Sequence, residues 1–367
     1  MLFVRRLMRK NRRVFVCGAV LLLLSVLLQL AARKADGFAD WYVRTVYPLL
    51  VGVLGRIFGL FPFSVSEVGL YLLLISALAA VFRFRKKKIQ LLAGSFCLAS
   101  GLFFSYTVCC GINYFGQPFS ASLSFSREKY GKEELSELLE WLTEQVNACY
   151  VETGLHSVRQ MGTLGVEAME RLGETYPALA GFYPQPKALL NSRLLSVQQL
   201  AGIYSPFTVE ANYNKEMTAY NIPHTICHEL SHLRGFMRED EANFIGFLAC
   251  IGSEDPEYRY SGYLSGWIYA GNALAGEDYE SYRGYYGKLR EEVRQDLGEN
   301  SLFWSRFESR ISEVSETVND TYLKANRQSE GVKSYGRAVD LMLGWYRQQQ
   351  GKNGGEIPKK IVLLTLE

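Results

Sequence analysis

Three long apolar runs in the first 112 residues constrain the fold of this chain more than any other feature. The run over residues 14–32 has no charged residue and is long enough to cross a bilayer as a helix. Two further runs cover residues 67–82 and 89–112. A basic start followed by an apolar core also fits a cleaved signal peptide, but the first run is long for one. We therefore expect three transmembrane helices near these positions, within a membrane region over residues 14–112.

Positive charge predicts the orientation of these helices. Residues 1–13 carry six Lys or Arg and no acid, and residues 83–88 carry five cations in six positions. Cationic segments stay on the cytoplasmic side, so three spans place the chain after Asn113 outside the cytoplasm. The sequence thus predicts a multi-pass protein of the cell (plasma) membrane, with the lipid bilayer as a partner. The net charge of +3 is too small to indicate nucleic acid.

The stretch between the first two runs, residues 41–63, is also apolar but is interrupted by Arg44, Pro48, Arg56 and Pro62. It favours an amphipathic helix at the outer membrane interface. The alternative is a fourth span, which would reverse the topology and conflict with one of the two basic flanks.

Residues 113–350 form the expected extracytoplasmic domain, followed by a tail over residues 351–367. Helical periodicity dominates from residue 126 to about 173, after Pro223, and over residues 334–350. Residues 174–189 carry three prolines and are typical of a loop. The segment "IYSPFTVEANYN" is aromatic and β-branched and indicates one or two strands. The predicted fold is mainly α with a small β element.

The histidines are concentrated in one short segment. Of the four in the chain, His224, His228 and His232 follow one another at four-residue intervals. Residues four apart share a helix face, so His228 and His232 can direct two imidazoles at one ion. Glu229 lies beside the first of them. This HExxH arrangement is typical of two zinc ligands with a general base that takes a proton from an attacking water.

A third ligand is expected shortly after Gly235, which favours the end of the first helix. One zincin class would place a histidine where this chain has Arg238, which cannot bind zinc. A second helix beginning there would carry acidic residues in its first turn, where the helix dipole favours carboxylates. Glu239 is the preferred ligand and Glu241 the alternative. Asn243 shares a face with Glu239 and could support a histidine ligand.

The chain resembles a bacterial family of membrane-anchored, gluzincin-like zinc-peptidase-like proteins classed as a domain of unknown function. The resemblance rests on the three spans and on "SPFTVEANYN", "HELSHLRGFMREDEANF" and "NDTYLKANRQSEGVKSYGRAVDLML". In such families the third ligand is the glutamate three residues before the alanine, which here is Glu239. The resemblance implies a zincin-like domain of the minigluzincin type over residues 113–350, with Zn²⁺ as cofactor and a peptide or protein substrate.

Further candidates surround this motif. His224 could orient a ligand or simply be packed, and Arg238 could bind a substrate carboxylate or pair with the acids beside it. Glu210 and Asn212 lie in the strand-like segment, which is either an edge strand that pairs with substrate or a plain core strand.

The sequence contains no CxxC pair among its seven cysteines, so a cysteine zinc site is not indicated. Cys227 and Cys250 could be joined by a disulfide or remain buried thiols.

The leading functional hypothesis is a membrane-anchored zinc metallopeptidase with Glu229 as general base. The alternatives are a non-catalytic metal-binding scaffold or sensor at the outer membrane face, and an amidase acting on cell-wall peptides. Intramembrane proteolysis is not favoured because both flanks of the HExxH segment are polar.

Overall fold

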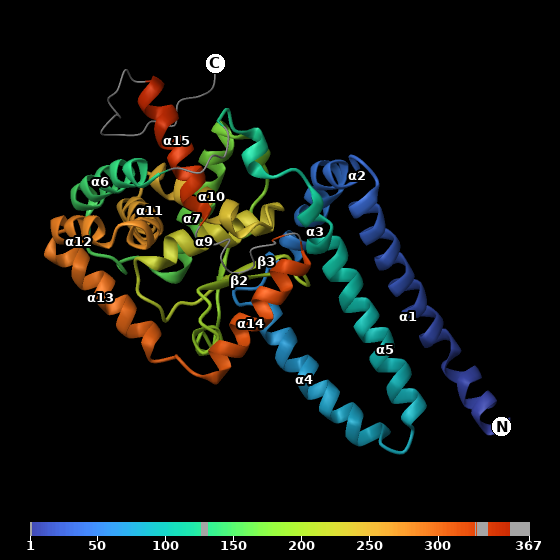
Figure 1. Cartoon of the computed structure of the whole chain (residues 1–367). Helices are drawn as coiled ribbons and strands as arrows, with labels where there is room; N and C mark the ends of the chain where they lie inside the picture. Colours follow the sequence, from blue (N-terminus) through green and yellow to red (C-terminus); the bar gives the residue numbers. More distant parts are fainter. Residues whose placement is uncertain (1, 126–130, 327, 329–336, 353–367) are drawn as a thin grey trace. The chain divides into compact units, whose positions relative to one another are not determined.

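The computed structural model describes residues 2–125, 131–326, 328 and 337–352 (Figure 1). The chain divides into two compact units. One comprises Met1–Gln117 together with Ser205–Glu210, and the other comprises Pro118–Tyr204 and Ala211–Glu367. The first unit thus includes a short loop far along the chain, which the sequence did not indicate.

Apolar helices form most of the first unit. The helices are α1 (Leu2–Lys34), α4 (Val65–Phe84) and α5 (Lys88–Tyr106), and α1 and α5 pack along each other (Figure 1). Three stretches are long and apolar enough to cross a membrane: Asn11–Lys34, Val65–Phe84 and Lys88–Phe115. The prediction of three N-terminal apolar helices is confirmed.

A further apolar helical stretch lies between α1 and α4 in the chain. It consists of α2 (Phe38–Trp41), a π-helical turn (Tyr42–Val46) and α3 (Tyr47–Gly59). Tyr47 and Val51 are buried on one face of α3, whereas Leu49, Val53 and Ile57 are exposed on another. Among the described residues, this stretch is not one of the three that are long and apolar enough to cross a membrane.

The N-terminus of α4 is held by the loop over residues 205–210. The carboxylate of Glu210 accepts hydrogen bonds from the backbone amides of Val65 and Ser66 at 3.1 and 2.8 Å, and from the hydroxyl of Thr208 at 2.7 Å. Ser64 caps the same helix through the amide of Glu67. A buried carboxylate at this position compensates the positive end of the helix dipole.

The second unit is a helical assembly. Its longer helices are α6 (Lys132–Cys149), α7 (Val158–Thr175), α9 (Asn221–Arg234), α10 (Glu239–Ile251), α11 (Pro256–Glu277), α12 (Tyr279–Lys288), α13 (Glu291–Ser305), α14 (Arg310–Ala325) and α15 (Ala338–Lys352), and α8 (Arg193–Ser196) is a single turn. Helices α9, α10 and α11 pack together, and α6, α7 and α15 surround them (Figure 1). The predicted α-rich character is confirmed, and α10 is buried along its whole length.

A small sheet accompanies these helices. Its strands are β1 (Lys187–Ala188), β2 (Gly202–Ser205) and β3 (Glu210–Tyr213), in the order β1-β3-β2. Strand β1 runs parallel to β3, with Lys187 opposite Asn212. The prediction that residues 174–189 are all loop is wrong at β1. Two residues carry no periodic signal, and their pairing depends on a strand more than twenty residues away.

Local signals fixed the helix ends well. Gly235 adopts φ 111° and ends α9, as expected for a left-handed helix terminus. Helix α9 begins at Asn221, with Tyr220 at the N-cap position. Residues 351 and 352, assigned to the tail, belong to α15. The rest of the predicted tail and residues 334–336 lie outside the described residues.

Candidate metal centre

The two histidines of the HExxH motif converge on one carboxylate. His228 and His232 lie one turn apart on α9, with ring centroids 4.6 Å apart. The Oε2 atom of Glu239, the first residue of α10, lies 3.2 Å from Nε2 of His228 and 3.5 Å from Nε2 of His232. One donor atom from each of these three residues lies within 4.8 Å of the others. We call this group the His–His–Glu cluster.

The remaining ring nitrogens are already bonded. Nδ1 of His228 lies 2.7 Å from Oδ1 of Asn243, and Nδ1 of His232 lies 2.8 Å from the carbonyl oxygen of Phe236. Because both partners are acceptors, each Nδ1 carries the proton in the neutral ring. In that neutral form each Nε2 is left without a proton, which is the tautomer that a metal ligand requires.

Glu229 lies next to the cluster and is buried. Its carboxylate accepts a hydrogen bond from the backbone amide of Tyr204 on β2. Its Oε2 has no hydrogen-bond partner among the described residues. Burial raises the pKa of Glu229 to about 7, although the neighbouring histidines oppose the shift. A buried carboxyl with one unbonded oxygen is costly unless that oxygen serves a ligand or a reaction.

The side chains of the cluster shift one another's pKa values. Burial alone would lower the pKa of His232, but the carboxylate of Glu239 outweighs it and raises that pKa to about 9. Burial would raise the pKa of Glu239, but His232 and His228 hold it well below its usual range. The three side chains therefore interact strongly with one another, as groups that share one small buried site do.

These donors suit zinc. Two imidazole nitrogens and one carboxylate are a common ligand set for a zinc site that leaves a further position open. The structure carries both Nδ1 acceptors that such imidazoles usually have, and the unbonded oxygen of Glu229 lies alongside. The residues present fit a single zinc ion.

Glu241, the alternative third ligand, points elsewhere. Its carboxylate accepts hydrogen bonds from the amides of Phe119 and Ser120 at 2.9 and 3.1 Å, and from the hydroxyl of Ser120 at 2.9 Å. Burial raises the pKa of Glu241, whereas the nearby charge of Arg238 lowers it. Glu241 thus fastens residues 119–120 to α10, and Arg238 forms the N-cap position of that helix.

His224 supports the cluster from one turn away. Its Nε2 lies 3.1 Å from the carbonyl oxygen of Asn243, and its backbone amide donates to the hydroxyl of Ser261. Burial lowers the pKa of His224 to about 3, so the ring is neutral and donates to that carbonyl. His224 therefore holds the backbone of the residue whose side chain bonds His228.

The side chains of the other two candidates bond other parts of the chain. The Glu210 carboxylate bonds the N-terminus of α4, as described above. The amide of Asn212 donates to the carbonyl oxygen of Ile203 at 3.4 Å. Among the described residues, the His–His–Glu cluster comprises His228, His232 and Glu239 and does not include Glu210.

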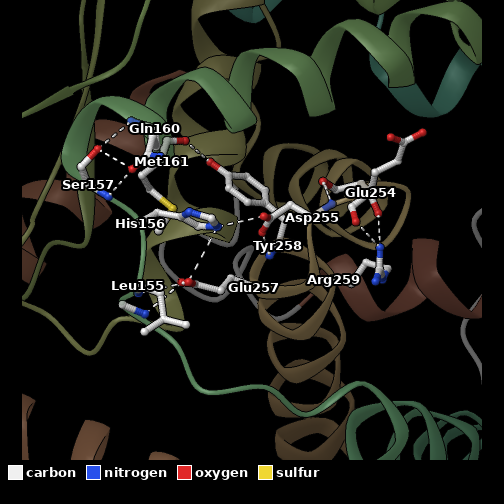
Figure 2. A network of polar contacts seen from close by, with 12 residues as sticks. Leu155, His156, Ser157, Gln160, Met161, Glu254, Asp255, Glu257, Tyr258 and Arg259 are labelled. Atoms are coloured by element: carbon white, nitrogen blue, oxygen red, sulfur yellow. Dashed lines mark hydrogen bonds and ion pairs between the residues drawn. The ribbon is translucent and has the colours of Figure 1, made fainter.

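The fourth histidine has a different role. Nε2 of His156 lies 2.8 Å from Asp255 and 3.7 Å from Glu257, and Glu257 accepts the amides of Gly154 and Leu155 (Figure 2). These contacts fasten the loop before α7 to the start of α11.

Sequence reasoning missed two residues beside the centre. Gly202 on β2 lies against Glu229, and Gln328 bonds the backbone at Glu239. A glycine after a loop was a weak signal for the first. The sequence held no signal for the second, because Gln328 is 89 positions away from its partner.

Cys227 and Cys250 lie face to face with their sulfur atoms 3.8 Å apart. Both are buried and both are free thiols in the structure. The alternative of separate, unbonded thiols is the one found.

Fold and site together define a class: a mainly helical chain with three helices suited to crossing a membrane and a largely buried His–His–Glu cluster. Residues 42–343 match the family described as proteins of unknown function, DUF3810, and the chain belongs to that family. No curated protein and no solved structure matches the chain.

Proposed function

We propose that this chain is a membrane-anchored, zinc-dependent metallopeptidase of the gluzincin type. The observation that carries the proposal is the convergence of His228, His232 and Glu239 beside the Glu229 carboxylate. A purely structural ion would need the three ligands but no neighbouring carboxylate with an unbonded oxygen. The combination of a ligand set with a candidate base favours hydrolysis.

The roles of the residues follow from their positions. His228, His232 and Glu239 would hold the ion, which when bound would polarise a peptide carbonyl and make an attacking water more acidic. Glu229 would take a proton from that water through its free Oε2 and later pass it to the leaving amine. The amide of Tyr204 holds the other part of the carboxylate, so the base is oriented before substrate binds.

The supporting residues act on these groups. Asn243 and the carbonyl of Phe236 fix the tautomer of the two imidazoles. His224 fixes the backbone of Asn243. Strand β2 lies next to Glu229, and its position beside the base supports a role in binding an extended peptide by strand pairing.

The membrane segments support a location at the outer face of the cell membrane. The basic N-terminus and the basic residues between α4 and α5 favour the cytoplasmic side. With three spans, the His–His–Glu cluster would then face outward, where membrane-proximal proteins or cell-wall peptides are accessible.

Two other functions make different predictions. A scaffold or sensor would bind zinc without using Glu229. An amidase acting on cell-wall peptides would use the same chemistry on another acyl bond, so only the substrate would differ.

The decisive experiment compares Glu229→Gln with His228→Ala in the full-length protein purified in detergent. Glu229→Gln should retain zinc and melting temperature while hydrolysis falls by about a hundredfold or more, because the base is lost but the ligands remain. His228→Ala should lose zinc, stability and activity together. His156→Ala is the matched histidine control and should keep its zinc.

Substrates for this comparison are a library of unstructured peptides and a set of cross-linked cell-wall peptides. Hydrolysis of the first set alone supports a peptidase, and hydrolysis of the second alone supports the amidase. If wild type and Glu229→Gln behave alike on both sets while the protein binds zinc, the scaffold function replaces the peptidase.

A further inference from the structure

The side chain of Gln328 forms hydrogen bonds with the backbone at the start of helix α10. Its Oε1 accepts a hydrogen bond from the backbone amide of Glu239 at 3.2 Å, and its Nε2 donates to the carbonyl oxygen of Met237 at 3.4 Å. The side chain is buried. The side-chain amide of Gln328 thus satisfies the backbone N–H of Glu239 and the backbone C=O of Met237, the two residues that flank Arg238.

Helix α10 needs such a partner because it lacks a cap of its own. The first amides of a helix have no acceptor within the helix. Arg238 occupies the N-cap position and its side chain makes no capping bond. The carboxylate of Asp240 accepts a hydrogen bond from the backbone amide of Glu241, and not from that of Glu239. The amide of Glu239 is therefore satisfied from a distant part of the chain.

Gln328 is itself held by the C-terminal end of helix α14. The backbone amide of Gln328 donates to the carbonyl oxygen of Leu323 at 3.0 Å, which places the residue directly after the helix. Leu323 is fully buried in the second unit. Gln328 thus connects a buried helix end to the backbone of Glu239.

We propose that Gln328 is a positioning residue of the metal centre, which holds the backbone of Glu239 so that its carboxylate meets the Nε2 atoms of His228 and His232. The inference rests on the metal site of the proposed function. A carboxylate can bind an ion with two imidazoles only if its own backbone is held in register with theirs. Loss of a group that orients a ligand typically weakens metal binding by about 10–100-fold.

The test measures zinc affinity by competition with a chromophoric chelator, in full-length protein and without any substrate. Gln328→Ala should weaken zinc binding by about tenfold or more. Asn326→Ala is the matched control: Asn326 is an equally buried amide in the same segment, at 7% exposure like Gln328, but it donates to Tyr322 within its own helix. Its zinc affinity should stay within about twofold of wild type, and the melting temperatures of both metal-free variants are measured alongside.

A spectroscopic readout separates positioning from general loss of stability. In cobalt-loaded protein, Gln328→Ala should change the visible absorption, because the carboxylate ligand shifts, and Asn326→Ala should not. If Gln328→Ala does not fold, Gln328→Glu serves instead: it keeps an acceptor for the Glu239 amide but loses the donor to Met237 and adds a charge, so it should also weaken zinc binding.

The inference is overturned if the folded Gln328 variant binds zinc within twofold of wild type, or if Asn326→Ala weakens binding as much. The two proposals fail differently. Tight zinc binding without any hydrolysis would contradict the peptidase proposal. The proposal for Gln328 would then still be tested by the zinc affinity of its variants. A wild-type protein that binds no zinc removes both.

Discussion

Gly202 lies closer to Glu229 than any residue with a side chain could. A Cβ atom on Gly202 would stand 2.6 Å from Oε1 and 2.7 Å from Cγ of Glu229, and 2.9 Å from the carbonyl oxygen of Asn212. Contacts below 3.0 Å require something to shift. Strand β2 can therefore approach the candidate base only because position 202 is a glycine.

Gly202→Ala should displace the Glu229 carboxylate. We expect a loss of stability of about 1–3 kcal/mol from overpacking and a marked fall in hydrolysis, with zinc content unchanged because no ligand is touched. Gly298→Ala on α13, where a Cβ meets open space, is the control. It should leave activity intact and add about 0.5–1 kcal/mol of stability. A fully active and equally stable Gly202→Ala protein would contradict this reasoning.

Substitutions of the two glutamates of α10 should have different effects on zinc content and stability. Glu239→Gln should lose most zinc, because the charged ligand is removed. Glu241→Gln should keep zinc but lower the unfolding free energy by about 1–3 kcal/mol, because its bonds to residues 119–120 are weakened. Metal content and chemical unfolding check both. Greater zinc loss in Glu241→Gln would show that the third ligand is wrongly assigned.

Asn243 should matter for metal affinity through His228. Asn243→Ala leaves Nδ1 of His228 without its 2.7 Å acceptor, so we expect zinc affinity to fall by about 10–100-fold. Asn243→Asp restores an acceptor and should recover most of the affinity. Chelator competition measures both, and an unchanged affinity in Asn243→Ala would exclude this role.

Asp296 should make stability depend on pH. Burial raises the pKa of Asp296, and the hydrogen bond from the hydroxyl of Tyr260 opposes the shift only in part. A raised pKa in the folded state favours the protonated acid. Its contribution to stability is present below the unfolded pKa of about 3.9 and is lost as pH rises through the folded value.

Asp296→Asn stays neutral and keeps an acceptor for Tyr260. The unfolding free energy of wild type minus that of the variant should therefore fall as pH rises from about 3 toward neutrality. Urea unfolding at several pH values measures this difference. A difference that stays constant, or rises with pH, would contradict the burial argument.

Topology can be tested with single cysteines in a background that lacks the native ones. A cysteine replacing the exposed Glu299 should react with a membrane-impermeant maleimide on intact cells. A cysteine replacing Lys86, between α4 and α5, should react only after the cells are opened. The reverse pattern would place the His–His–Glu cluster in the cytoplasm.

Periodicity in the sequence was enough for the features that depend on one helix. The apolar runs predicted the three candidate spans, since crossing a membrane is a requirement on length and composition alone. The spacing of His228 and His232 predicted that they share a face, because helical geometry fixes where residues four apart lie. Gly235 and Arg238 marked the end of α9 and the start of α10 for equally local reasons.

Contacts between elements had to come from the tertiary structure. Glu239 and Glu241 lie in the same first turn, and composition could not determine which of them meets the histidines. The packing of α10 against α9 directs Glu239 toward Nε2 of His228, whereas Glu241 bonds Ser120. Likewise, Glu210 bonds α4 from more than 140 positions away, and Gln328 reaches Glu239 across 89. Such pairs leave no period in the sequence, because they are set by the way separate elements pack and not by the geometry of any one of them.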